Sequence, residues 1–294
     1  MKKILLALLL VCILAIGVLL ASYFTGYEIY RDVGYADGEE QKMDIFISKA
    51  AYGRDTNGCV LFIHGGSWSG GDKSEEALRC RLLASQGYIA ATLNYTLWSE
   101  ETASEYSVMQ ALDDIDAALT ELKTFALAKG IVIDKVATSG YSAGAHLSML
   151  YSYSRGEGAP MEILFTSNMA GPADISARVW GNDMAKRVGK RLTGVDISDE
   201  DLESEQIKAL LESVSPTSYV DADTPPSIIM HGGKDDVVPI ANAESLIDKF
   251  TEYSVDYDYV YLKNSDHTLI QNPLKHITYY RLLLSYCEEY FGAN

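Results

Sequence analysis

The most constraining feature of the sequence is a repeated alternation between short apolar runs and longer amphipathic stretches. The apolar runs lie at 43–47, 60–66, 88–95, 135–140, 162–167, 227–233 and 255–262. The helix-like stretches lie near 74–86, 104–129, 143–153, 240–253 and 274–291. Nearly continuous apolar runs are typical of strands covered on both faces, and their alternation with helices indicates βαβ units. The sequence therefore predicts an α/β protein with a mostly parallel central sheet and helices on both faces.

Two segments depart from this alternation. The strand candidates near 27–35 and 43–47 have no helix between them, which predicts an antiparallel start to the sheet. Residues 171–215 carry helical patches and an acidic stretch at 196–205 but no clear strand. Because 294 residues suit one large core, we interpret 171–215 as a small helical, cap-like insertion over the sheet edge, within a single domain at 27–294.

Residues 1–26 are predicted to be a separate N-terminal segment, either a membrane anchor or a signal peptide. Residues 4–21 carry no charge and, as a helix, would reach about 27 Å, close to the hydrocarbon thickness of a bilayer. The length of this run, and a leucine where a cleavage site needs a small residue, favour an uncleaved anchor. Two lysines precede the run and would stay cytoplasmic, so the domain is expected in an extracytoplasmic location. Cleavage would make it a secreted protein.

Charge and cysteine usage exclude some partners. The chain has 24 basic and 41 acidic residues and a net charge of −17, so a phosphate backbone would be repelled and no nucleic-acid partner is expected. Outside the N-terminal segment, Cys59, Cys80 and Cys287 lack the spacing of a zinc site. We predict neither a metal nor a cofactor.

Ser142 lies at the centre of "GYSAGAH", between an apolar run and a helix-like stretch. This is the context of the G-x-S-x-G nucleophile elbow, in which the serine occupies a sharp turn from strand to helix. Gly140 and Gly144 would let the two backbones approach closely, and the serine would take a strained conformation that projects Oγ outward. Ser142 is therefore the candidate nucleophile.

A serine hydroxyl is a weak nucleophile and needs a base, and the base needs an acid that orients it. His267, in "NSDHTL", follows the last strand candidate, at the end of a strand where the functional groups of open α/β sheets gather. His146 lies on the helix-like stretch after Ser142 and is interpreted as a packing or hydrogen-bonding residue. His267 is the candidate base.

The candidate acid comes from "HGGKDDVVP", which follows another strand candidate. Asp235 is the preferred residue, and Asp236 stays open as an alternative. The order Ser142, Asp235, His267 along the chain matches that of the α/β-hydrolase triad.

Negative charge that develops on a carbonyl oxygen needs hydrogen-bond donors, each worth about 3–4 kcal/mol. The sequence "HGGSW" follows a strand candidate, and its glycines would let backbone N–H groups turn inward. We expect the backbone N–H groups of Gly66, Ser67 and Ala143 to form an oxyanion hole. His64 would brace this loop through hydrogen bonds.

From about residue 40 to its end, the chain resembles α/β-hydrolase carboxylesterases of the hormone-sensitive-lipase-like kind, especially the acetyl- and feruloyl-esterase-like members. The resemblance rests on "FIHGGSW", "LNYTLW", "GYSAGAHLS", "SPTSYVDADTPPSIIMHGGKDDVVP" and "SDH". It implies a Ser–Asp–His triad, no cofactor and cleavage of short acyl esters. Two departures are Thr96, where members commonly carry arginine, and Ser67, where many carry a third glycine. In "LNYTLW", Asn94 is expected to make a supporting hydrogen bond.

The expected reaction is a two-step acyl transfer on a short-chain carboxylic ester, through an acyl-enzyme on Ser142. Since "HGGSW" also resembles arylformamidases, cleavage of a formamide or another amide by the same residues is the first alternative. The second alternative is a non-catalytic surface protein that uses the fold to bind a ligand, because fold alone does not imply function.

Overall fold

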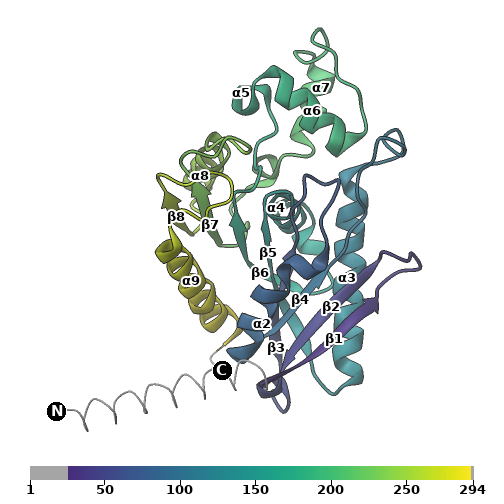
Figure 1. Ribbon diagram of the computed structural model, residues 1–294, viewed down its shortest axis with the longest axis vertical. Coiled ribbons are helices and arrows are strands. Elements are labelled where there is room, and N and C mark those ends of the chain that lie inside the picture. The colour runs from purple at the N-terminus through teal and green to yellow at the C-terminus, as the bar shows by residue number, and fades with distance from the viewer. Residues whose placement is uncertain (1–25, 293–294) are drawn as a thin grey trace, which may run out of the picture.

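The computed structural model describes residues 26–292, in which a single eight-stranded sheet forms the centre of the molecule (Figure 1). Its strands lie in the order β1-β2-β4-β3-β5-β6-β7-β8. They are β1 (Tyr27–Gly34), β2 (Lys42–Ser48), β3 (Asn57–Ile63), β4 (Ile89–Leu93), β5 (Ile133–Tyr141), β6 (Glu162–Met169), β7 (Ser227–Gly232) and β8 (Tyr257–Leu262).

Strand directions follow the predicted scheme. β2 is antiparallel to both β1 and β4, and every other neighbouring pair is parallel. All seven residues of β3 are buried, as expected for a central strand that is covered on both faces. The chain therefore has the predicted α/β-hydrolase fold, with a mostly parallel sheet and an antiparallel start.

Helices cover both faces of the sheet. They are α2 (Ala77–Ser85), α3 (Val108–Ala128), α4 (Ala143–Arg155), α8 (Ala241–Tyr253) and α9 (Pro273–Phe291). In β3, Val60 and Phe62 pack in the core formed with α2 and α9, whereas Leu61 and Ile63 pack in the core formed with α3 and α4. This alternation of side chains between faces is the two-residue period of a strand, and it places the two helix layers on opposite faces.

Three further helices lie between β6 and β7, above the carboxyl edge of the sheet (Figure 1). They are α5 (Ala177–Trp180), α6 (Asn182–Thr193) and α7 (Glu205–Glu212). They fall within residues 171–215, the range in which the sequence predicts a helical insertion. The acidic stretch pairs with α6, where Lys186 contacts Asp199 and Lys190 Nζ lies 2.8 Å from Asp196.

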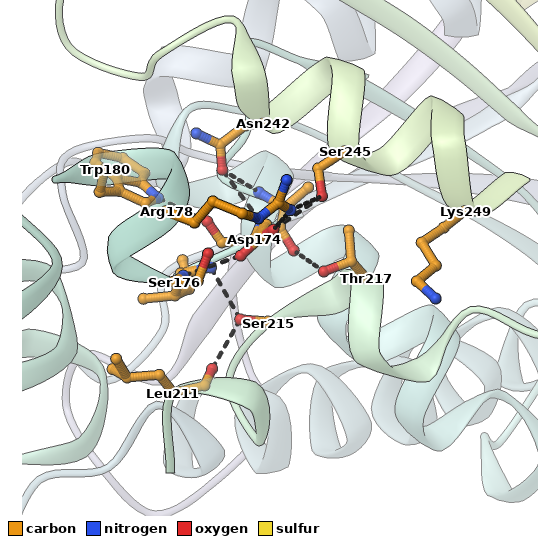
Figure 2. A network of polar contacts seen from close by, with 12 residues as sticks. Asp174, Ser176, Arg178, Trp180, Leu211, Ser215, Thr217, Asn242, Ser245 and Lys249 are labelled. Atoms are coloured by element: carbon orange, nitrogen blue, oxygen red, sulfur yellow. Dashed lines mark hydrogen bonds and ion pairs between the residues drawn. The ribbon is translucent and has the colours of Figure 1, made fainter. Parts of the chain in front are cut away.

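The two ends of this insertion are bonded to each other. The Ile175 N–H donates to Ser215 Oγ at 2.9 Å, and the Thr217 N–H donates to Ala173 O at 3.0 Å. Ser215 Oγ in turn donates to the Leu211 carbonyl of α7, as Figure 2 shows. The chain therefore enters and leaves the insertion at one place, a closed junction in which residues 173–175 are hydrogen-bonded to residues 215–217.

The start of the insertion is also tied to α8 (Figure 2). The Asp174 carboxylate accepts hydrogen bonds from Arg178 and from Ser245 of α8, each at 2.8 Å. Asn242 Oδ1 accepts from the backbone N–H of Asp174 at 3.1 Å. These bonds position the chain just after β6, and β6 lies beside β5, the strand that leads into Ser142.

The predicted anchor or signal segment, residues 1–26 with its apolar run at 4–21, lies almost entirely outside the described residues. Within residues 26–292, no helix has both the length and the apolar character that a membrane crossing requires.

Candidate active site

Ser142 sits at the turn between β5 and α4, and its backbone is held in a conformation that side chains rarely adopt, with φ 55° and ψ −121°. The two flanking glycines make this turn possible. A Cβ on Gly140 would lie 2.3 Å from the Gly144 carbonyl carbon, and one on Gly144 would lie 2.0 Å from the Ile63 carbonyl oxygen. Only glycine fits at both positions, so the elbow follows directly from the G-x-S-x-G spacing.

The structure brings Ser142, Asp235 and His267 together in one hydrogen-bonded row. His267 Nε2 lies 3.0 Å from Ser142 Oγ, and His267 Nδ1 lies 2.8 Å from Asp235 Oδ2. The carboxylate accepts the Nδ1 proton, which leaves Nε2 as the acceptor for the serine hydroxyl. This arrangement of atoms is the one that activates a hydroxyl as a nucleophile.

The Asp235 carboxylate is fully buried, and both of its oxygens accept hydrogen bonds. Oδ1 accepts from the backbone N–H groups of Val237 at 3.0 Å and Val238 at 2.8 Å, while Oδ2 faces His267. Asp236, the alternative acid, is exposed and does not contact His267. The geometry favours Asp235 over Asp236.

His231 lies behind the acid and was not assigned a role from sequence. Its Nε2 donates to the Val238 carbonyl at 3.0 Å and lies 3.5 Å from Asp235 Oδ2. Burial lowers the pKa of His231, so the ring stays neutral near pH 7 and does not compete with His267 for the carboxylate. Its bond to Val238 stabilises the turn whose N–H groups hold Asp235.

Two further side chains fix the His267 loop. The Tyr141 hydroxyl donates to the His267 carbonyl at 2.8 Å, and the two ring centroids lie 5.2 Å apart. Burial raises the pKa of Tyr141 to about 12, so it remains a donor at neutral pH. His276 Nε2, from the first turns of α9, donates to the Leu269 carbonyl at 2.8 Å. Sequence reasoning missed both contacts because their partners are backbone carbonyls, which every residue carries.

The predicted oxyanion loop lies against the elbow. A Cβ on Gly65 would lie 3.5 Å from Ser142 Cβ. Gly66, Ser67 and Trp68 all have positive φ, at 110°, 53° and 59°. Two successive non-glycine residues in this region cost on the order of 1–3 kcal/mol each, so the surrounding contacts must hold the loop in place.

Three backbone N–H groups near Ser142 have no hydrogen-bond acceptor among residues 26–292. They belong to Gly66 and Ser67 in the loop and to Ala143, the first residue of α4. The Ala143 N–H is one of the donors that every helix start leaves unpaired. These are the donors that the sequence predicts for an oxyanion hole.

His64 and Asn94 make the supporting contacts expected of them. His64 Nδ1 donates to the Gly65 carbonyl at 2.7 Å, and its ring stacks on Tyr95 with centroids 4.4 Å apart. Burial lowers the pKa of His64, which keeps the ring neutral. Asn94 Oδ1 accepts from the Lys73 N–H at 2.7 Å and so fixes the chain that follows the loop.

Taken together, the site can attack an electrophilic carbonyl and stabilise the oxyanion that results. A buried carboxylate orients a neutral imidazole, the imidazole accepts a proton from a serine, and unpaired N–H groups lie beside that serine. These are the parts needed for acyl transfer.

The chain is similar in sequence to a protein family and to several curated proteins. The sequence model of the BD-FAE family matches residues 43–250, which include Ser142 and Asp235. The probable carboxylic ester hydrolase LipM of Mycobacterium tuberculosis is 26% identical over 262 residues, covering 77% of this chain and 54% of LipM. The chain spans between 28% and 60% of the length of the curated relatives it matches.

Two solved structures are similar in fold. Esterase B from Lactobacillus rhamnosis has a TM-score of 0.70 and 21% identity, with 97% of this chain and 94% of that chain covered. The butyrate-bound esterase Est2 of the planctomycete Thermogutta terrifontis has a TM-score of 0.68 and 19% identity, with 90% and 94% covered. At these identities the likeness shows the fold.

Proposed function

The chain belongs to the BD-FAE family, and from that premise we propose that it is a serine hydrolase that cleaves carboxylic esters through an acyl-enzyme on Ser142. The observation that carries this proposal is the hydrogen-bonded row from Asp235 through His267 to Ser142, beside unpaired backbone N–H groups. The similarity to LipM, a probable carboxylic ester hydrolase, supports the same reaction.

In the first half-reaction, Ser142 Oγ attacks the ester carbonyl carbon while His267 Nε2 accepts the hydroxyl proton. Asp235 keeps the proton of Nδ1 on the far side of the ring and stabilises the imidazolium that forms. The N–H groups of Gly66, Ser67 and Ala143 donate to the oxyanion. When the tetrahedral intermediate collapses, the imidazolium gives its proton to the leaving alcohol, and the acyl group stays on Ser142.

In the second half-reaction, water takes the place of the alcohol. His267 Nε2 removes a proton from the water as its oxygen attacks the acyl carbon, and the same N–H groups hold the second oxyanion. Collapse returns the proton to Ser142 Oγ and releases the carboxylic acid. Every proton is carried by His267, so no cofactor is required for this reaction.

We further propose that the acyl group is short, from acetyl to butyryl. Support comes from the helices α5–α7, which lie over the carboxyl edge of the sheet (Figure 1), and from the contact of Val214, just after α7, with His146 of α4. The similarly folded Est2 binds butyrate, which is consistent with a small acyl subsite.

The test is hydrolysis of p-nitrophenyl acetate, butyrate and octanoate, with covalent labelling by a fluorophosphonate probe. Ser142→Ala should lower kcat by about 10⁵- to 10⁶-fold and abolish labelling, because it removes the nucleophile. Ser285→Ala, at an exposed position of α9, is the matched control and should match the wild type.

Three outcomes would contradict parts of the proposal. Absence of labelling in the folded wild type would favour a non-catalytic binding protein. Faster turnover of N-formylkynurenine than of any ester would favour amide cleavage by the same residues. Preference for octanoate over acetate would refute the short acyl subsite while leaving the reaction itself intact.

A further inference from the structure

His146 connects three parts of the molecule that converge on Ser142. It lies on α4, one turn after the nucleophile, and it is fully buried. Its backbone N–H donates to the Ser142 carbonyl at 3.1 Å. Its side chain reaches both the oxyanion loop and the end of the insertion. Both ring nitrogens are hydrogen-bonded, as is usual for a buried polar side chain, so the importance of His146 lies in which partners it joins.

Each ring nitrogen of His146 has its own partner. The Trp68 indole N–H donates to Nδ1 at 3.2 Å, with the two rings edge to face at an interplanar angle of 87°. Nε2 lies 2.8 Å from the Val214 carbonyl, two residues beyond the end of α7. Because a carbonyl can only accept, the proton is on Nε2 and Nδ1 is the acceptor for Trp68. Both bonds require this one neutral tautomer.

Trp68 constrains the position of Ser67, its neighbour in the chain. It follows Ser67, both have positive φ, and its side chain is buried. Its carbonyl accepts from the Trp98 N–H at 2.7 Å, so Trp68 is held at its backbone by one segment and at its indole by His146. A change in the position of Trp68 would move the Ser67 N–H relative to the oxyanion.

We propose that His146 is a positioning residue for the oxyanion hole, which holds the Ser67 N–H in place through Trp68 and couples that loop to the end of the insertion through Val214. The inference rests on the proposed function, since it concerns a donor to the oxyanion of that reaction. His146 does not touch the substrate. Its effect is expected on the rate of the chemical step more than on substrate binding.

Two substitutions at His146 separate its two hydrogen bonds. His146→Asn keeps an acceptor close to the position of Nδ1 and loses the donor to Val214. His146→Gln keeps a donor close to the position of Nε2 and loses the acceptor for Trp68. Trp68→Phe removes the indole N–H from the other side of the same bond. Thermal unfolding and near-ultraviolet circular dichroism identify the variants that fold.

With p-nitrophenyl acetate, His146→Gln and Trp68→Phe should each lower kcat by about 10- to 100-fold, with KM within about twofold of the wild type, because a displaced donor loses part of the 10²- to 10³-fold effect of an oxyanion contact. His146→Asn should keep kcat within about threefold. The rate of Ser142 labelling by the fluorophosphonate should fall in parallel with kcat, since phosphonylation develops charge at the same place.

The double variant Trp68→Phe/His146→Gln should be no slower than the slower single variant, because each change removes the same bond between Trp68 and His146. The inference is overturned if folded His146→Gln or Trp68→Phe retains the wild-type kcat, if His146→Asn is as slow as His146→Gln, or if the two single effects multiply in the double variant. If His146→Gln does not fold, the kcat of Trp68→Phe tests the inference by itself.

Failure of the two proposals can be told apart. If the wild type hydrolyses esters and Ser142→Ala does not, the proposed function holds, and a fast His146→Gln defeats only the role of His146. If the wild type neither hydrolyses an ester nor reacts with the fluorophosphonate, the proposed function fails and the role of His146 falls with it.

Discussion

At the scale of single residues, Asp235 and Asp236 show how two adjacent carboxylates acquire different uses. Asp235 is buried, accepts two backbone N–H bonds and faces His267, whereas Asp236 points to solvent. A carboxylate that must orient an imidazole needs a fixed position, and only Asp235 has the donors that fix it.

Replacing these neighbours gives a matched pair. Asp235→Asn should lower kcat by about 10⁴-fold, because an amide cannot hold His267 in the required tautomer. Asp236→Asn should leave kcat within about twofold. Steady-state hydrolysis of p-nitrophenyl acetate by both variants is the measurement, and a larger loss in Asp236→Asn than in Asp235→Asn would contradict the assignment.

Buried histidines also set a pH dependence of stability. Burial lowers the pKa of His146 from its ordinary 6.5 to about 4, and it lowers the pKa values of His64 and His231 as well. Between the lowered pKa of each histidine in the folded protein and its ordinary pKa in the unfolded chain, the unfolded chain binds a proton that the folded chain does not. The free energy of unfolding therefore falls as the pH falls through this range. Asp114, whose pKa is raised by burial, acts with the opposite sign.

We therefore expect the free energy of unfolding to decrease as the pH falls below 6.5, with His146 contributing up to about 1.4 kcal/mol per pH unit down to about pH 4. Urea denaturation at pH 7, 6, 5 and 4.5 is the measurement. In His146→Gln the free energy of unfolding should depend less steeply on pH, because this variant lacks the contribution of one histidine. Equal slopes in the wild type and in this variant would show that His146 does not remain neutral in the folded protein.

At the scale of elements, the junction of β5 and α4 depends on two glycines. Gly140→Ala places a Cβ 2.3 Å from the Gly144 carbonyl carbon, and backbone atoms cannot give way as a flexible side chain would. We expect it to lower the free energy of unfolding by about 2–4 kcal/mol. Gly158→Ala, which would meet no atom within 4 Å, should change it by less than about 0.5 kcal/mol. Chemical denaturation of both variants is the test, and equal stabilities would refute the close approach.

Much of this arrangement is predictable because its signals are local. Apolar runs predicted β2 to β8, a strand candidate near 27–35 predicted β1, and Ser142, Asp235 and His267 each stand in a short motif at the end of a strand. His146, His231 and Tyr141 were not assigned their contacts, because their partners are the carbonyls of Val214, Val238 and His267. Because every residue has a backbone carbonyl, the sequence does not indicate which carbonyl accepts a given side-chain hydrogen bond.

At the scale of the whole molecule, the chain enters the sheet at the edge opposite the active site. Tyr27 pairs with Ser48, at the same end of the sheet as the start of β4, whereas Ser142 follows the other end of β5. Figure 1 shows the start of β1 and helices α5–α7 at opposite ends of the molecule. We propose that residues 4–21 anchor the protein in a membrane, with its domain on the extracytoplasmic side and the active site directed away from the bilayer.

This proposal predicts that the full-length protein sediments with membranes and resists extraction by alkaline carbonate, while residues 27–294 remain in the supernatant. Protease added to intact spheroplasts should degrade the domain, because it lies outside the cytoplasm. Recovery of a mature protein from the medium that begins near residue 22 would show instead that the segment is a signal peptide. Protection of the domain from the protease would contradict both the anchor and the signal peptide, because each places the domain outside the cytoplasm.

The closed junction at the base of α5–α7 bears on how such a protein can diversify. Ile175 bonds to Ser215 and Ala173 bonds to Thr217, so residues can be gained or lost between these pairs without changing where β6 ends or β7 begins. Selection for a new substrate can therefore act on the length and composition of that loop while the reacting groups stay where they are. Val214 is the exception within it, because its carbonyl accepts a hydrogen bond from His146, and a change in the loop that moves Val214 would break this bond.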